Sequence, residues 1–214
     1  MAIFSDTFTD TDGVLLQSHV PDTGTSWTRL WGTTNTNAEI NTNRCRSDGD
    51  LNSGVMYTAD GTYPSADYDI TCTMVTMVAA NDRPIFLMVR IQDQENMYAV
   101  RLETTASESS LYKKVSGTWT AVGSLFTKPA DGSVIKLEII GTALKFYDDG
   151  VELASATVSD ISAAGKAGIG FGGGAELVTS GDDGSTSNVI DTLTVNNLGG
   201  GAVAVKHLAI LGVG

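Results

Sequence analysis

The sequence predicts an all-β protein built from two packed antiparallel sheets, and three observations lead to this conclusion. Apolar and polar residues alternate in short blocks along most of the chain, as they do in half-buried strands. No segment before the C-terminal end repeats apolar residues at the i, i+3, i+4, i+7 spacing of an amphipathic helix. The chain contains 24 glycines, which favour tight turns over helices. So many short strands in one domain imply two sheets that cover each other.

The alternating segments are the predicted strands, in chain order 3–9, 28–32, 68–79, 85–92, 97–103, 111–115, 119–123, 134–140, 143–147, 151–157, 166–171 and 189–195. The clearest hairpin signal is Asp148-Asp149-Gly150, because a turn that needs positive φ angles takes Asp and Gly at low cost. It predicts that 143–147 and 151–157 pair.

The register of a second hairpin follows from a four-residue turn at 93–96. This turn predicts that Ile91 faces Tyr98, which makes one face of the pair wholly apolar. Six residues are then predicted to point into the core: Leu87, Val89, Ile91, Tyr98, Val100 and Leu102. The opposite face is mixed and is predicted to be accessible to solvent or to a ligand, with Phe86, Met88, Arg90, Gln92, Met97, Ala99, Arg101 and Glu103.

Length and charge limit the architecture and the partners. At 214 residues, we expect one domain over residues 1–195, followed by a Gly-rich apolar tail over residues 196–214. The net charge of −12 disfavours binding to nucleic acid, and the apolar run in the tail is too short to span a bilayer. The first residues lack the pattern of a secretory signal, so we expect synthesis in a cytoplasm. Cys45 and Cys72 are expected to be free thiols.

Several motifs resemble those of concanavalin A-like lectin/glucanase (laminin G-like) domains, which occur in many phage and bacterial reading frames. They are Phe4-Ser-Asp6-Thr-Phe8, Asp12-Gly13 with Leu16, His19, Pro21-Asp22, Gly24 and Trp27, then Phe86 to Asp93, Asn96 to Leu102, Leu144 to Leu153, Gly165 to Phe171 and Val189 to Val195. The resemblance covers most of residues 3–195. It implies a jelly-roll sandwich of two curved antiparallel sheets with a concave face. It implies no single function, because lectins, glycosidases and structural modules share this sandwich.

Glycosidase activity is not expected. Retaining glycosidases need two carboxylates roughly 5 Å apart, and the resemblance implies that both would come from one strand. None of the seven glutamates has another glutamate within four residues. The sequence therefore predicts that the protein is not an enzyme.

A sugar-binding face is the alternative for the mixed face of the hairpin. Arg90 and Arg101 would be neighbours there, with Glu103 as a counter-charge and Tyr112 and Trp119 as stacking surfaces. A structural face held by salt bridges explains the same residues and is favoured, because charge networks on surfaces are common.

A calcium ion is the one cofactor that the sequence leaves open. Asp6 and Asp191 fall in the first and last predicted core strands, which the resemblance makes neighbours, and carboxylate oxygens suit Ca²⁺. The alternative is that a short Asp near a strand end caps a turn. No cofactor is the main expectation.

The tail is predicted to be an assembly segment. After three glycines, residues 202–213 hold one charged side chain, Lys206, and an apolar set able to pack on a neighbour: Val203, Val205, Leu208, Ile210, Leu211 and Val213. A tail folded back on its own domain as one more strand is the alternative.

The function expected from these observations is that of a phage virion structural protein, either a capsid decoration protein or a tail-fibre component. Its partners would be the major capsid or tail protein and further copies of itself. A non-catalytic, lectin-like module that binds surface glycans is the second expectation.

Overall fold

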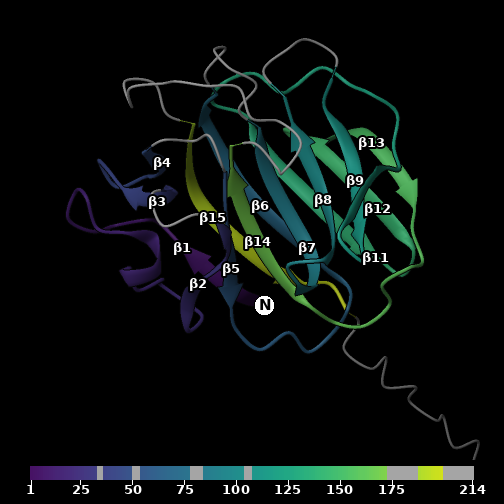
Figure 1. Ribbon diagram of the computed structural model, residues 1–214, viewed down its shortest axis with the longest axis horizontal. Coiled ribbons are helices and arrows are strands. Elements are labelled where there is room, and N and C mark those ends of the chain that lie inside the picture. Colours follow the sequence, from purple (N-terminus) through teal and green to yellow (C-terminus); the bar gives the residue numbers. More distant parts are fainter. Residues whose placement is uncertain (33–35, 50–53, 78–83, 104–107, 173–187, 200–214) are drawn as a thin grey trace, which may run out of the picture.

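The computed structural model describes residues 1–32, 36–49, 54–77, 84–103, 108–172 and 188–199. This part of the chain forms two antiparallel sheets, one behind the other in Figure 1, with β14, β7 and β8 crossing in front of β15 and β6. The helical content of these described residues is one 3₁₀ turn, η1 (Leu16–Ser18). Within the described residues, no helix is long and apolar enough to cross a membrane.

Sheet A has the order β13-β12-β11-β6-β15-β4-β3, and β1 pairs with β15 beside β4. Its strands are β1 (Ala2–Asp6), β3 (Thr36–Ile40), β4 (Cys45–Gly49), β6 (Tyr68–Thr76), β11 (Val134–Ile140), β12 (Ala143–Asp148), β13 (Val151–Thr157) and β15 (Val189–Asn197).

Sheet B has the order β10-β9-β8-β7-β14-β5-β2. Its strands are β2 (Ser26–Gly32), β5 (Val55–Asp60), β7 (Ile85–Asp93), β8 (Asn96–Leu102), β9 (Ser110–Val115), β10 (Thr118–Ala121) and β14 (Lys166–Phe171). The all-β, two-sheet antiparallel sandwich expected from the sequence is confirmed.

The main core lies between the sheets and contains large side chains from both. The largest of them are Trp27, Tyr57, Tyr68, Tyr98, Phe4, Phe8, Phe146 and Phe171, all at most 2% exposed. Their removal from water supplies about 1.5 to 3 kcal/mol each. Cys45 and Cys72 are buried in this core as free thiols, and burial raises the pKa of both.

Tyrosine hydroxyls connect the two layers through the core. The hydroxyl of Tyr68 in sheet A contacts the main-chain oxygens of Gly165 and Lys166 at 2.9 and 3.0 Å, beside β14 of sheet B. From sheet B, the hydroxyl of Tyr98 accepts a hydrogen bond from the N–H of Ile161 at 2.7 Å. Burial raises the pKa of both phenols, so they stay protonated and can donate.

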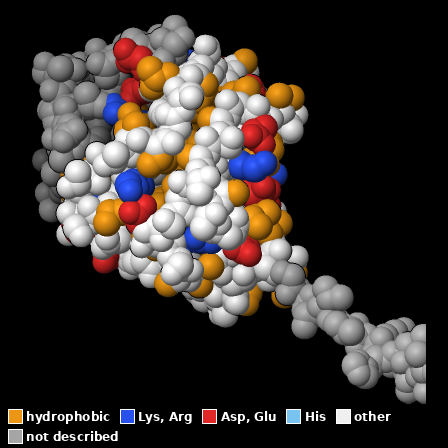
Figure 2. All heavy atoms as spheres, turned by 90° about the vertical axis from the view of Figure 1, so that its right-hand side faces the viewer, with side chains coloured by type: hydrophobic (Ala, Val, Ile, Leu, Met, Phe, Trp, Pro, Cys, Tyr) orange, Lys and Arg blue, Asp and Glu red, His pale blue; other side chains and the backbone are white. Residues whose placement is uncertain are grey.

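The outer face of sheet A carries paired charges among exposed apolar and polar side chains. Lys136 contacts Glu138 at 3.0 Å and lies 4.0 Å from the ring centre of Tyr147, while Lys145 contacts Glu152 at 2.8 Å. Figure 2 views the side of the molecule that carries β9 and β11–β13, and blue and red side chains adjoin there in several places. Exposed pairs of this kind contribute about 0 to 1 kcal/mol each, so this face is mainly solvated.

All twelve predicted strands are present, and the described residues contain three further strands that were not predicted. The segments β3, β4 and β5 fall in the stretch between residues 33 and 67, where no strand was predicted. β3 and β4 contain Asn, Asp, Ser and Gly, which have low strand propensity. β5 is buried on both faces, so apolar residues follow one another without a period of two.

Candidate functional site

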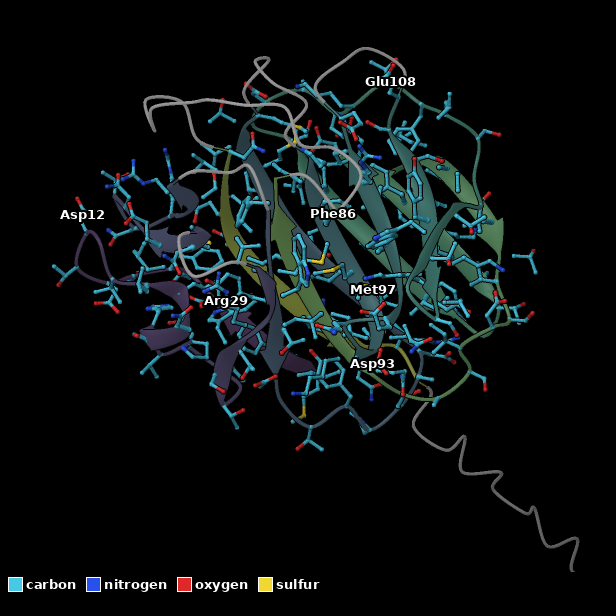
Figure 3. All side chains as sticks on the ribbon, viewed as in Figure 1. Asp12, Arg29, Phe86, Asp93, Met97 and Glu108 are labelled. Carbon is cyan, nitrogen blue, oxygen red and sulfur yellow. The ribbon has the colours of Figure 1, made fainter. Side chains whose placement is uncertain are left out.

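The outer face of sheet B, which points away from the main core, carries a second apolar cluster. Cross-strand pairing places Trp31, Met56, Gly170, Phe86, Arg101 and Ser110 in one row across the sheet. Met56, Phe86, Met88, Ile91, Met97 and Ala99 form the buried part of this cluster, and Leu30, Trp31 and Trp119 pack on it while remaining partly exposed. In Figure 3, Phe86 and Met97 lie on the face of sheet B that is turned towards the viewer.

Two glycines in β14 make this cluster possible. A Cβ at Gly168 would lie 2.3 Å from the main-chain oxygen of Tyr57 and 2.8 Å from Cδ1 of Ile91. A Cβ at Gly170 would lie 3.1 Å from Met56 and 3.3 Å from Phe86. Side chains of the flanking strands therefore lie over β14 where it has none of its own.

Aromatic rings border the cluster on the β9–β10 side. The indole of Trp119, on the edge strand β10, lies 5.9 Å from the ring centre of Phe86 on β7, although β9 and β8 lie between these two strands. The Tyr112 ring meets the same indole edge-on at 6.3 Å, and Lys114 Nζ lies 5.6 Å from the centre of the Trp119 ring. The reach of Trp119 across two strands indicates that this face is concave.

An ion pair lies next to these rings. Arg101 Nε contacts Glu103 Oε1, and the Arg101 guanidinium lies 5.8 Å from the centre of the Tyr112 ring. The Glu103 side chain is 4% exposed and that of Arg101 is 20% exposed, so the arginine is the more accessible partner. The structure thus brings together Arg101, Glu103, Tyr112 and Trp119, four of the five residues predicted for a sugar-binding face.

Arg90, the fifth predicted residue, does not lie on this face. It has a φ of 50° at a register shift in the β7–β8 pair, and its side chain points between the sheets. There the guanidinium, 3% exposed, donates to the main-chain oxygens of Ala66, Ile161 and Gly141 at 3.0, 3.0 and 2.8 Å. Its fourth acceptor is the carboxylate of Asp67 at 3.3 Å. The predicted position of Arg90 beside Arg101 on the mixed face is therefore wrong.

The same bulge moves Ile91 to the opposite face. Asp93 faces Asn96 as the predicted turn requires, but beyond the bulge Val89 faces Tyr98 and Leu87 faces Val100, two residues out of the predicted register. Leu87, Val89, Tyr98, Val100 and Leu102 point into the main core as predicted. Ile91 belongs to the outer cluster instead, because one residue at positive φ reverses the alternation of side chains.

Asp6 and Asp191 lie on paired strands, β1 and β15, as the predicted metal site required. Both oxygens of Asp6 accept protein hydrogen bonds, from the N–H of Phe8 and the indole of Trp27 at 2.6 Å and from His19 Nε2 at 2.9 Å. Asp191 lies 3.6 Å from Arg44. Within the described ranges, no group of three or more His, Cys, Asp or Glu side chains could hold a metal ion. The two residues therefore do not fit a calcium site, because their oxygens face protein donors.

His19 bridges two carboxylates. Its Nε2 lies 2.9 Å from Asp6 Oδ1 and its Nδ1 lies 2.9 Å from Asp10 Oδ2, so both ring nitrogens donate only when the ring is an imidazolium. Burial lowers the pKa of His19, but the hydrogen bonds to Asp10 and Asp6 outweigh it and the pKa is raised. The hydrogen bond from His19 in turn lowers the pKa of Asp10. This group fastens the loop after β1 to the sandwich, and we assign it a structural role.

Sequence reasoning missed part of the site. Trp31 and Met56 were not predicted to belong to the cluster on this face, because β5 was not predicted and its pairing with β2 could not be inferred. The signal that could have found the cluster is Gly168-Ile-Gly170-Phe171, where alternate glycines in a strand mark a close approach by neighbouring side chains. The tail residues predicted for assembly, between Val203 and Val213, lie outside the described residues.

Comparisons with solved structures identify the fold. The chain is similar to the β-glucanase of Bacillus licheniformis, with a TM-score of 0.58 at 12% identity, covering 92% of this chain and 98% of that one. It is similar to a Bacillus subtilis protein of unknown function with a galectin-like fold, with a TM-score of 0.57 at 11% identity over 87% and 97% of the two chains. The carbohydrate-binding module CBM66 of Bacillus subtilis gives a TM-score of 0.52 at 17% identity, over 80% and 92%.

No protein-family model and no curated protein sequence matches the chain. The fold is a concanavalin A-like, galectin-like jelly roll, as the resemblance in the sequence implied. A β-glucanase and a carbohydrate-binding module are thus both among the similar structures.

Proposed function

We propose that this chain is a non-catalytic, lectin-like module that binds a saccharide on the outer face of sheet B. The observation that carries the proposal is the grouping of Trp119, Tyr112 and Phe86 beside the Arg101–Glu103 ion pair on a face that the main core does not use. Sugar rings present C–H faces that pack on aromatic rings and hydroxyls that hydrogen-bond to charged, planar groups. The partly exposed Trp119 and Arg101 supply one group of each kind.

The carboxylates in this part of the molecule support binding without hydrolysis. Among the described residues, the strands of sheet B contain Asp60 at the end of β5 and Asp93 at the end of β7, and Glu103, which contacts Arg101, directly follows β8. Hydrogen bonds from the N–H of Glu95 and from Asn96 lower the pKa of Asp93. Burial raises the pKa of Asp60, but hydrogen bonds from Lys166, Thr28 and Thr58 outweigh it and the pKa is lowered. A general acid for glycoside cleavage needs a raised pKa, so Asp60 is unsuited to that role.

The test is a glycan array probed with the full chain, followed by titration calorimetry on any hit. Trp119→Ala and Arg101→Ala are expected to weaken binding about tenfold or more, given about 1 to 2 kcal/mol for each lost contact. Tyr147→Ala is the matched control, because Tyr147 is an aromatic residue beside a lysine on the outer face of sheet A. Equal loss in Trp119→Ala and Tyr147→Ala, or no loss in Trp119→Ala, would reject the site. Release of reducing sugar that Glu103→Gln abolishes would reject the non-catalytic role.

We propose, as a second role, that the protein is a structural component of a phage particle attached through its tail. This role is supported by the apolar composition of residues 202–213. It is also supported by the completion of the β15 pairings before this segment begins. The N–H groups of Leu198 and Gly199 both donate to the main-chain oxygen of Asp67 at 2.9 Å, after the last pairs of β15. The partner would be the major capsid or tail protein.

Co-sedimentation with particles tests this role. The full chain should pellet with them, whereas a chain with Ile210→Asp and Val205→Asp should remain in the supernatant while keeping the circular dichroism of the parent. Pelleting of both proteins to the same extent would reject attachment through the tail. Lys206→Gln is a control that alters the tail without adding a charge to its apolar set.

A further inference from the structure

A groove lies beside β1, away from the outer face of sheet B. We call it the β1 groove; it encloses about 350 Å³ and is lined by residues that include Ala2, Ile3, Thr25, Gly61, Thr62 and Pro64. This volume is in the range of about 300 to 1,000 Å³ typical of sites that take a ligand. None of the side chains that line the groove is charged, in a protein whose net charge is −12. The lining combines the apolar side chains of Ala2, Ile3 and Pro64 with threonine hydroxyls, so the groove suits an uncharged chain segment that presents apolar side chains and main-chain groups.

One side of β1 is open at this groove. Along its other side β1 pairs with β15 from Ala2 to Asp6. Towards the groove, the pairing in the described part of the chain is a single bridge, in which Ser5 and Thr23 exchange two hydrogen bonds of 3.1 and 3.0 Å. Before Ser5 the strand edge thus offers the main-chain groups and the side chain of Ile3, and Gly61, which has no side chain, faces the Ile3 oxygen from across the groove. A main-chain edge with an apolar side chain is what strand addition uses.

The path of the described chain after β15 favours a second copy as the source of the occupant. Asn197 lines the groove and its N–H bonds to the main-chain oxygen of Met1 at 3.3 Å. The next two N–H groups, of Leu198 and Gly199, bond to Asp67, which directly precedes β6. Because β6 and β1 lie on opposite sides of β15, the chain turns away from its own groove as it leaves the sandwich.

We propose that the β1 groove binds the apolar segment 202–213 of a second copy of this chain. The segment is rich in small and β-branched residues, which suit an added strand, and Lys206 is its one charged side chain apart from His207 when protonated. Val203 and Val205, two residues apart, would share one face of such a strand. The inference rests on the proposed assembly role of the tail and names the surface that receives it.

The experiment uses light scattering and sedimentation velocity on the full chain. Thr62→Asp puts a charge on an exposed residue of the groove, and Val203→Asp with Val205→Asp puts charges on the tail. Thr142→Asp makes the same change at an exposed threonine in the β11–β12 turn, outside the groove, and is the matched control. We expect the parent and Thr142→Asp to self-associate alike, and the groove and tail variants each to associate at least about tenfold more weakly.

Mixing the two defective chains makes the test directional. Thr62→Asp keeps an intact tail, and the tail variant keeps an intact groove, so an equimolar mixture should form a dimer that neither protein forms alone. Normal association of Thr62→Asp, with loss in the tail variant, would overturn the groove but leave the assembly role of the tail. A parent chain that stays monomeric at its highest soluble concentration would overturn the inference. Particle co-sedimentation by that chain would still support the proposed attachment.

Discussion

The guanidinium of Arg90, on β7 of sheet B, donates a 2.8 Å hydrogen bond to the main-chain oxygen of Gly141, in the β11–β12 turn of sheet A. Asp67 joins the same group, because its Oδ1 accepts from Arg90 at 3.3 Å and from the N–H of Gly141 at 2.8 Å. A buried cation thus ties three segments of the two sheets together at one end of the sandwich.

Replacing Arg90 should destabilise the protein strongly. Arg90→Ala leaves three buried main-chain oxygens without this donor and removes the cation that pairs with Asp67, so we expect a loss of about 3 to 5 kcal/mol in the free energy of unfolding, measured with urea. Arg90→Lys should lose less, because an ammonium keeps the charge but fewer of the bonds. Glycan binding by Arg90→Lys should match the parent. A loss below about 0.5 kcal/mol in Arg90→Ala would contradict this account.

The bridge from His19 to Asp6 and Asp10 should make stability depend on pH. Since the pKa of His19 is raised in the folded state, its contribution is fully present below the unfolded value of about 6.5 and is lost as pH rises through the folded value. His19→Gln should therefore cost about 1.5 to 3 kcal/mol near pH 6 and clearly less near pH 9. Unfolding curves of both proteins at several pH values measure this, and a cost that does not change with pH would refute the charged bridge.

The two outward glycines of β14 should differ in their tolerance of a methyl group. Gly168→Ala would press a Cβ to 2.3 Å from a main-chain oxygen, whereas the contacts at Gly170 begin at 3.1 Å with a flexible methionine. We expect a loss of about 1 to 3 kcal/mol for Gly168→Ala and a smaller loss for Gly170→Ala. Thermal unfolding of the two variants shows which one loses more stability. A larger loss for Gly170→Ala than for Gly168→Ala would show that the cluster packs differently.

Removal of the residues after Gly199 should leave the sandwich stable. β15 completes its pairs with β1 and β6 by Asn197, and the bonds to Asp67 end at Gly199. We expect the free energy of unfolding of the 1–199 chain to lie within about 0.5 kcal/mol of the full chain at low concentration. A loss of several kcal/mol would instead show that the tail folds onto its own domain.

The period-two pattern was sufficient to find a strand whose two faces differ, such as β11, whose predicted bounds agree with the structure. It could not find β5, where both faces are covered. Nor could it show that Arg90 and Ile91 exchange faces, because a bulge depends on what surrounds it. The acceptors that draw Arg90 inward come from loops 51 and 71 residues further along the chain. Tertiary contacts of this kind cannot be inferred from the local alternation of apolar and polar residues.

The adjacency of β1 and β15 also has a kinetic consequence. Phe4 faces Val195, so the first strand of the sheet has no long partner until nearly all of the described chain has been synthesised. The same holds for one side of β6, since β15 inserts between β6 and the pair of β1 and β4. Contacts this distant in sequence slow folding, because the chain loses the conformational entropy of closing a long loop before the favourable contacts between the strands can form. On a ribosome, sheet A would therefore close only after β15 emerges, and the nascent chain would expose the edge of β6 until then.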